Sequence, residues 1–335
     1  MATALAYPVR SPNWILTYQG IDITTEVGPM VRTIYYYDRL GSASGELEIE
    51  FEDRDKLWQG PWYPALGDEV NVSIGYQGEE LQPCGTFQVD ELELDGPPDV
   101  MKIRCLAAFI TPAMRTLNSA GYEGQTILGI AETIANKYSL QLITAPKTPD
   151  VAYERVTQKR ETDLEFLRRL ADEHGYDFTV RGSLMVFYAL EALESAAPVI
   201  TIERSNTLRF GFRNRSRGIY AGAQVAYQDP VGKRLIAATQ SSAETTPTAN
   251  TLKLVTRCEN GSQAAVKAAA GLHFHDMRFI ETAIDGPGSA ALAAGITVAI
   301  SGWGVLDGTY LVESARHRID RATGYTTAIA ARRVS

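Results

Sequence analysis

The sequence predicts a mainly β protein with α+β insertions, in which two similar β-barrel domains are joined by a small α/β module. Both ends of the chain alternate apolar and polar residues between Gly-containing turns, which is typical of half-buried strands. The stretch between them instead places apolar residues at helical spacing. The chain has 335 residues, so two or three domains are expected.

The two ends also carry the same motifs in the same order. The first set begins with L-G-D-E-V-N-V-S-I-G at Leu66 and continues with G-T-F-Q-V-D-E at Gly85–Glu91. The second begins with L-A-A-G-I-T-V-A-I-S-G at Leu292 and continues with G-T-Y-L-V-E-S at Gly308–Ser314. This match indicates an internal duplication.

A third strand follows in each set. Phe87 and Ile103 are as far apart in the chain as Tyr310 and Thr326, which aligns Ile103 with Thr326. Antiparallel hairpins share much of this pattern, so two unrelated hairpins are the alternative to a duplication. A chain with two similar β domains can place six of them in a ring by forming a trimer.

Residues 1–111 are predicted to form the first β-barrel domain. Its loop Trp58–Pro64 reads W-Q-G-P-W-Y-P. Trp58 and Trp62 are candidate interface residues, because Trp and Tyr anchor protein contacts. The alternative is that this loop folds over the end of its own barrel. Strands are expected at residues 14–18, 31–37, 46–52, 70–76, 86–94 and 101–108.

Residues 112–203 are predicted to form the α/β module. One helix spans residues 125–138. Thr162 and Glu165 form the capping box of a second helix, which ends at Gly175. Two strands are expected to follow, at 177–181 and 184–190.

Residues 204–335 are predicted to form the second β-barrel domain, with an inserted helix near 262–277. Residues 286–306 carry no charge, yet they alternate with period two and contain several Gly residues. Paired strands are therefore expected there and not a membrane-spanning helix. Other strands are expected at 209–213, 222–227, 235–239 and 252–257.

Charge, cysteine content and missing motifs exclude several classes of protein. The formal net charge is -8 and the isoelectric point is near 5.2, which argues against a general nucleic-acid binder. The three cysteines contain no C-x-x-C and are expected as core residues of a protein made in a reducing compartment. The N-terminus has no secretory signal. No P-loop or dinucleotide motif occurs, so no catalytic residue and no cofactor are expected.

The four histidines supply one metal-like cluster, His273-Phe-His275-Asp276. His273 and His275 are the weak candidates for a metal site, although a helix would place them about 200° apart and a structural metal needs further ligands. His174 and His317 stand alone in the sequence, and we expect them at the surface or at helix caps.

One basic run alternates with phenylalanines. Alternation places its arginines on one face of a strand. Arg213 and Arg215 are therefore candidate interface residues, and an ion-paired subunit contact is favoured over nucleic acid. The run comprises Arg209, Arg213, Arg215 and Arg217.

The segment Val156–Phe178, V-T-Q-K-R-E-T-D-L-E-F-L-R-R-L-A-D-E-H-G-Y-D-F, resembles a recurring segment of tail hub proteins. The resemblance is to the phage late control D family, the baseplate hubs of contractile phage tails, with relatives in the N-terminal part of type VI secretion spike proteins. It covers most of the chain. Other matching elements are G-I-D-I-T at Gly20–Thr24, the W-x-x-x-W-x-P element ending at Pro64, Gly67–Val70, Gly85–Glu91, Asp95–Pro98, the G-Q-T-I-L helix start and Asp307–His317.

The resemblance implies a homotrimeric structural hub that is not an enzyme. In this family, two β-barrel tube domains per chain form a pseudo-hexameric ring between the six-fold tail tube and the trimeric spike. The implied partners are the spike protein, the tail tube protein, the tape measure protein and other baseplate proteins. DNA passes through the lumen where the particle carries it, and no stable membrane association is expected.

The implied location is the baseplate of a virion or of a tail-like bacteriocin particle, assembled in the cytoplasm of the bacterial host. Because the chain ends soon after the second set of β motifs, we expect the spike to be a separate polypeptide.

Two other classes of function stay open. A tail-associated cell-wall-degrading enzyme would need a carboxyl group with a raised pKa in a cleft. A glycan-binding tail-tip protein would need Trp58, Trp62 and Trp303 exposed on one shallow face.

Overall fold

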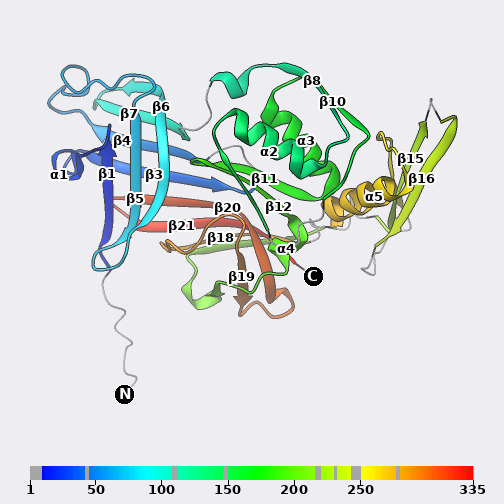
Figure 1. Cartoon of the computed structure of the whole chain (residues 1–335). Coiled ribbons are helices and arrows are strands. Elements are labelled where there is room, and N and C mark those ends of the chain that lie inside the picture. The colour runs from blue at the N-terminus through cyan, green and yellow to red at the C-terminus, as the bar shows by residue number, and fades with distance from the viewer. Residues whose placement is uncertain are drawn as a thin grey trace.

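The structure, a computed structural model, describes residues 10–41, 45–107, 112–145, 150–215, 220–229, 232–242, 250–276 and 280–334. Strands from both ends of the chain build one sheet of thirteen strands, and three smaller sheets stand apart from it. Two helix-containing units lie beside this large sheet (Figure 1).

The first β domain forms because alternating residues place apolar side chains on one face of each strand. In Glu46–Glu52, Leu47, Ile49 and Phe51 point into the core while the carboxylates face outward, as predicted. The strands pair in the order β3-β4-β7-β6-β5-β1-β2, all antiparallel. The elements are β1 (Pro12–Tyr18), β2 (Ile21–Asp22), α1 (Thr24–Val27), β3 (Val31–Arg39), β4 (Glu46–Glu52), β5 (Glu69–Tyr76), β6 (Gln82–Asp95) and β7 (Val100–Ala107).

The middle module contains the two predicted helices around a core of its own. The predicted capping box of the second helix is present, and Gly175 ends that helix in the left-handed conformation at φ 73°. Three further strands, β8, β9 and β10, were not expected from the sequence. The elements are η1 (Pro112–Arg115), β8 (Asn118–Glu123), α2 (Ile127–Lys137), β9 (Gln141–Thr144), β10 (Arg155–Glu161), α3 (Asp163–His174), β11 (Tyr176–Arg181), β12 (Leu184–Ala189) and α4 (Leu190–Glu194).

The second β domain pairs its strands in the order β14-β18-β21-β20-β19-β13. Its apolar core is formed by side chains from these strands, with Tyr310 completely buried. The elements are β13 (Ile200–Glu203), η2 (Arg204–Asn206), β14 (Arg209–Asn214), β18 (Ile280–Pro287), β19 (Thr297–Ser301), η3 (Gly304–Leu306), β20 (Gly308–Asp320) and β21 (Gly324–Arg333).

A separate unit lies between β14 and β18 in the chain. The sequence predicts only a helix as the insertion, but the strands expected at 222–257 also belong to it, because they pair with one another in the order β16-β15-β17. The helix packs its alanine-rich face on this small sheet. The elements are β15 (Gly222–Asp229), β16 (Arg234–Ser241), β17 (Thr251–Leu254) and α5 (Gly261–Asp276).

The two β domains share strand order and local detail. β3, β4, β7, β6, β5 and β1 correspond in order to β14, β18, β21, β20, β19 and β13. Gly67 and Gly295 both have positive φ, at 91° and 87°, and their N–H groups donate to Val89 and Val312 at 2.8 and 2.9 Å. One difference is that β1 is antiparallel to β5, whereas β13 is parallel to β19.

A β-bulge falls at the same place in each copy. The register of β6 against β7 shifts between Val89 and Glu91, and that of β20 against β21 shifts between Val312 and Ser314. The bulged residues, Asp90 and Glu313, occupy the same position in G-T-F-Q-V-D-E and G-T-Y-L-V-E-S. Bulges are specific features, so a shared one supports a duplication over two unrelated hairpins.

The third strand of the repeat aligns differently from the sequence prediction. Ile103 pairs with Leu92, and Ile329 pairs with Ala315, which holds the same place after the bulge. Ile103 therefore corresponds to Ile329 and not to Thr326. The second hairpin is longer than the first, so residues equally spaced in the sequence do not hold equivalent positions in the two hairpins.

The two domains meet through β20 and β3, strands from opposite ends of the chain that lie side by side, red and blue in Figure 1. Tyr36 of β3 stacks on His317 of β20 with ring centroids 5.7 Å apart. On the opposite face, the Arg318 guanidinium lies 5.6 Å from the ring centroid of Tyr35. The fold class is thus as predicted: mainly β, with two similar β-barrel domains and α/β units beside them.

Candidate interaction surfaces

The loop Trp58–Pro64 lies over the end of its own β domain. Trp58 is only 5% exposed and packs on Phe51 with ring centroids 4.1 Å apart. Its backbone N–H donates to Asp53 at 3.0 Å, which fixes the start of the loop. Trp62 stands edge-on to Trp58 at 5.7 Å and is 37% exposed. Trp58 is therefore a core residue, and Trp62 is the member of the pair that reaches the surface.

A cavity of about 440 Å³ opens beneath this loop. Its lining is mostly apolar and comes from the loop, from Val27 of α1 and from inward-facing strand residues. Trp303 lies in the second β domain, where its ring contacts those of Phe210 and Phe212. The three indoles do not form one shallow exposed face, so the requirement for a glycan-binding surface is not met.

Arg213 and Arg215 lie at the outer edge of the large sheet. Arg213 is exposed and faces Glu281 of β18 in the register. Arg215, just after β14, pairs with Glu281 at 2.7 Å. Arg217, which was grouped with them, lies outside the described residues. The two arginines are therefore at a strand edge where a further strand could add to the sheet.

His273 takes part in a polar junction, which we define as Glu194, His273, Glu313 and Arg332. Nε2 of His273 lies 3.0 Å from Glu194, and buried Arg332 pairs with Glu194 at 2.5 Å and with Glu313 at 3.3 Å. Burial acts to raise the pKa of Glu194, but the bond from His273 and the charge of Arg332 outweigh it and lower that pKa. The junction ties α4, α5 and the second β domain together.

The two candidate metal ligands point to different neighbours. The ring of His275 stands edge-on to Tyr220 at 5.1 Å, whereas His273 faces Glu194. In the described part of the chain, no three His, Cys, Asp or Glu residues gather as a metal site would require.

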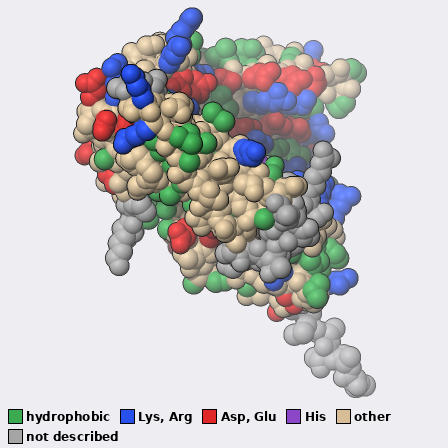
Figure 2. Space-filling view, turned by 90° about the vertical axis from the view of Figure 1, so that its right-hand side faces the viewer, with side chains coloured by type: hydrophobic (Ala, Val, Ile, Leu, Met, Phe, Trp, Pro, Cys, Tyr) green, Lys and Arg blue, Asp and Glu red, His purple; other side chains and the backbone are tan. Residues whose placement is uncertain are grey.

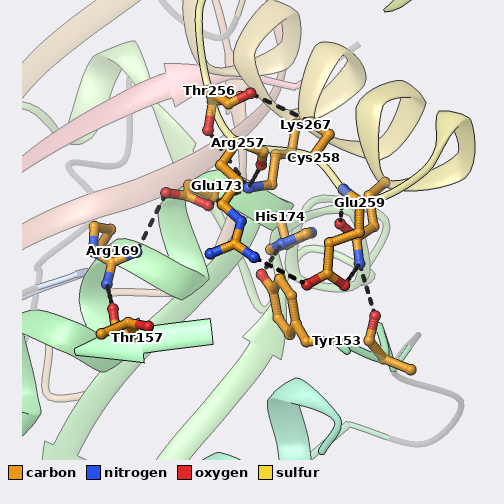
Figure 3. A network of polar contacts seen from close by, with 12 residues as sticks. Tyr153, Thr157, Arg169, Glu173, His174, Thr256, Arg257, Cys258, Glu259 and Lys267 are labelled. Atoms are coloured by element: carbon orange, nitrogen blue, oxygen red, sulfur yellow. Dashed lines mark hydrogen bonds and ion pairs between the residues drawn. The ribbon is translucent and has the colours of Figure 1, made fainter. Parts of the chain in front are cut away.

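A second polar cluster joins α3 to α5 (Figure 3). Lys267 of α5 is 5% exposed, and its Nζ donates to Glu173 at 2.5 Å and to the carbonyl of Arg257 at 2.9 Å. Nε2 of His174 lies 2.6 Å from the Tyr153 hydroxyl. Burial lowers the pKa of His174 to about 3, and the charge of Lys267 acts in the same direction. The bond from Lys267 to Glu173 links the inserted unit to the middle module.

Asp38 connects three parts of the molecule. It is buried at the end of β3, accepts from Arg181 of the middle module at 2.8 Å, and accepts the N–H of Ala294 of the second β domain at 2.8 Å. Removing its carboxylate would leave both donors without this acceptor.

Surface charge is mixed. The face in Figure 2 carries rows of Asp and Glu with Lys and Arg nearby. On the outer face of the first β domain, Arg104 bonds Glu48 at 3.1 Å and Glu91 at 2.9 Å across neighbouring strands. Among the residues that the structure describes, neither of these two faces presents the continuous basic patch of a nucleic-acid binder. No helix in the described ranges is long and apolar enough to cross a membrane.

This fold is that of phage tail proteins. Over 96% of its length the chain is similar to the 43 kDa tail protein of prophage MuSo2 from Shewanella oneidensis, with a TM-score of 0.72, 17% identity and 98% of that chain covered. It is equally similar to a tail protein from Neisseria meningitidis MC58, with a TM-score of 0.72, 12% identity and 96% of that chain covered. An E. coli component of the type VI secretion system matches with a TM-score of 0.59 and 14% identity, over 96% of this chain and 77% of that one.

Comparison of the sequence identifies a narrower group of proteins than comparison of the fold. Residues 65–323 match the family described as phage tail baseplate hub (GPD), and the chain belongs to it. Probable baseplate hub proteins of Escherichia phages P2 and 186 are 29% identical over 229 residues and 28% identical over 216 residues. These matches cover 66% and 63% of this chain but 58% and 55% of the relatives, so it spans little more than half of their length. The resemblance predicted from the sequence is confirmed.

Proposed function

We propose that three copies of this chain form the hub of a contractile-tail baseplate. In this proposal, six similar β domains close a ring that connects the six-fold tail tube to the trimeric spike. The hub family supports the location, and the duplicated strand order supports the ring. Three chains with two equivalent domains each can present six equivalent positions to one partner and three to the other.

The observation that carries the ring is the join between the two domains. β20 continues beyond the end of β19 and pairs with β3, so both copies of the repeat share one sheet. A join of this kind is head-to-tail, because it uses a different edge on each side. Repeated between chains, head-to-tail contacts generate a closed ring when the rotation per unit fits.

The proposed role is structural. The hub would hold the spike protein and the tail tube protein on opposite faces, beside the tape measure protein and other baseplate proteins, with DNA passing through the lumen where the particle carries it. The baseplate of a virion or tail-like particle, assembled in the host cytoplasm, is its proposed location. The buried polar clusters described above join the units of one chain and support a rigid framework.

The test is the assembly state of the full chain. The chain is co-expressed with a candidate trimeric spike protein, and the product is examined by light-scattering mass and negative-stain imaging. We expect three times the 36.7 kDa of one chain plus the mass of the bound spike, and rings with a central opening. A strict monomer, with spike protein present and no ring in the images, would exclude this function. Hydrolysis of purified cell wall by the chain alone would favour the enzymatic alternative.

A further inference from the structure

The edges of β6 and β14 are among those strand edges of the large sheet that have no neighbouring strand in the described residues. β6 pairs with β5 only as far as Gln88, so Glu91–Asp95 pair with β7 on one side and with no strand on the other. β14 pairs with β18 alone. Open edges present unpaired N–H and C=O groups that can take another strand.

The equivalent edges are paired inside the chain. β20 corresponds to β6, and β3 corresponds to β14, in the duplicated strand order. Beyond its bulge, β20 runs antiparallel along β3 from Ser314 opposite Arg39 to Asp320 opposite Thr33. The open part of β6 is therefore the counterpart of a strand that takes β3, and β14 is the counterpart of β3.

The bulges fix the register on the β6 side. Glu93 is the third residue after the bulge at Asp90, and Arg316 is the third after the bulge at Glu313. Arg316 faces Tyr37 in the internal join. Glu93 therefore faces the residue of a neighbouring chain that corresponds to Tyr37.

The adjacent strands fix the register on the β14 side. Glu46 of β4 and Glu281 of β18 hold corresponding positions, because they pair with corresponding residues of β7 and β21. Glu46 pairs with Tyr37, and Glu281 pairs with Arg213. Arg213 is therefore the counterpart of Tyr37, and it falls opposite Glu93 of the neighbouring chain.

We propose, resting on the trimer proposed above, that Glu91–Asp95 of β6 in one copy pairs antiparallel with β14 and Arg215 of the next copy. Glu93 lies opposite Arg213, and Glu91 lies opposite Arg215. An acidic edge thus meets a basic edge, and charge complementarity selects this partner and this register.

Three of the four charges at this join already have ion-pair partners within their own chain. Glu91 bonds Arg104 at 2.9 Å, Glu93 pairs with Lys102 at 3.4 Å, and Arg215 pairs with Glu281. Docking would connect these ion pairs and leave no charge alone in the interface. The ladder would then run from β18 of one copy through the join to β7 of the next.

The other face of the join is apolar. Leu94 corresponds to His317, and Phe212 corresponds to Tyr36, the stacked pair of the internal join. Leu94 is 47% exposed in the single chain and would be covered by Phe212 of the neighbour. Phe210, 42% exposed on the same strand, adds to this apolar contact.

The internal and external joins differ in chemistry. Inside the chain, Arg316 and Arg318 of β20 face Tyr37 and Tyr35 of β3. If β14 replaced β3 on β20, Arg213 would face Arg316, and like charges directly opposite each other destabilise a strand pair. Each edge therefore favours its own partner, so the two kinds of join alternate around the ring.

The test uses two differently tagged full-length chains, one carrying Glu93→Cys and the other Arg213→Cys. Opposed residues of an antiparallel pair are close enough for a disulfide. Within one chain, six strands separate β6 from β14, so the two positions are not neighbours in a single sheet. A disulfide between them must therefore join two chains. After mixing and mild oxidation, we expect a covalent heterodimer that carries both tags.

In the matched control, the second chain carries Arg209→Cys in place of Arg213→Cys. Arg209 lies four residues away on the same strand and is out of register with Glu93 of the neighbouring chain. We expect at least about tenfold less heterodimer from this mixture, a ratio read from the two-tag band on a denaturing gel. Trimeric mass with no cross-link, or with equal cross-linking in both mixtures, would overturn the join while leaving the proposed function in place. A wild-type chain that stays monomeric with spike protein present would overturn both.

Discussion

His317 shows how one side chain can make the internal join sensitive to acid. It is buried between Tyr36 and Tyr325, its Nε2–H donates to the carbonyl of Leu292 at 2.9 Å, and its Nδ1 lies 2.8 Å from the Tyr325 hydroxyl. Burial lowers the pKa of His317 to about 4, below its ordinary value of 6.5. The neutral ring is therefore the form that fits the join, whereas the sequence predicts a position at the surface or at a helix cap.

Acid should weaken the fold through this residue. The unfolded chain takes up a proton below about pH 6.5 while the folded chain does not, so the stabilisation is present above pH 6.5 and is lost as the pH falls toward 4. Between pH 7 and pH 5 the loss is about 2 kcal/mol. We expect His317→Gln to reduce the difference in unfolding free energy between these two pH values by about that amount, measured by urea unfolding.

A matched comparison is His174→Gln. The pKa of His174 is also lowered, to about 3, so this variant should reduce the difference in unfolding free energy between pH 7 and pH 5 by a similar amount. The reductions from the two variants should add. Identical pH dependence in wild type and both variants would contradict the assignment of buried neutral histidines.

Lys267 is the clearest case of a buried charge that holds two units together. Replacing it by Met leaves Glu173 with only its 3.6 Å contact to Arg169, and we expect a loss of about 3 kcal/mol in unfolding free energy. The double variant Lys267→Met with Glu173→Gln should recover part of that loss, because no carboxylate that has lost its 2.5 Å partner remains. Urea unfolding of the four variants of this cycle measures the coupling.

Exposed Lys253 on β17 supplies the control. Lys253→Met should change the unfolding free energy by less than about 0.5 kcal/mol. If Lys267→Met behaved like Lys253→Met, the pair would not hold α5 on α3.

Sequence reasoning separates buried from exposed residues poorly when one residue type serves both uses. Trp58 and Trp62 stand four positions apart in one loop, yet only Trp62 reaches the surface. His174 and His317 were expected at the surface or at helix caps. Both are buried, His174 in the last turn of α3, because their polar partners come from distant segments. The charges of the polar junction were missed for the same reason. The alternation of Glu91 and Glu93 with Leu92 and Leu94 was a usable signal of a strand with one charged face.

At the scale of elements, local signals predicted what local contacts determine. The capping box of α3 was readable because Thr162 and Glu165 satisfy each other's backbone N–H groups within one turn. The helices α2 and α3 and the strands of the repeat were recognised from periodicity. The pairing of β15–β17 was not, because the partner of a strand is chosen by contacts far away in the chain.

The cap of α3 can be tested directly. Thr162→Ala removes the oxygen that accepts the N–H of Glu165 at 3.1 Å, and we expect a loss of about 1 kcal/mol in unfolding free energy. The midpoint of urea unfolding should fall without a change in slope. Thr162→Ser keeps the hydroxyl and should retain most of the stability; equal losses in the two variants would argue against the cap.

At the scale of the whole molecule, the duplication was predictable and its consequence was not. Repeated motifs reveal two similar domains, but they do not reveal that β20 joins β3 to make one sheet. That join depends on strand edges, which carry no short-range signature. The open edges of β6 and β14 likewise became visible only when the two copies could be compared strand by strand.

Charge reversal at the proposed join should act on assembly and spare the fold. Glu93→Arg and Arg213→Glu each place like charges opposite one another, and we expect each to weaken trimer formation by at least about fivefold. The double variant restores the pair with inverted sign and should recover most of the affinity. Sedimentation across a concentration series measures the three dissociation constants. A double variant no better than either single one would count against the pairing.

The inserted unit has a consequence for overall shape. In the first copy a short connection leads from β3 to β4, whereas in the second the corresponding connection, from β14 to β18, carries β15–β17 and α5. Only the second of the two equivalent connections therefore contains an inserted unit. Where such copies alternate around a common axis, six similar β domains surround the interior, but only three inserted units lie at the periphery. Each chain therefore contributes to a six-fold interior and to a three-fold exterior.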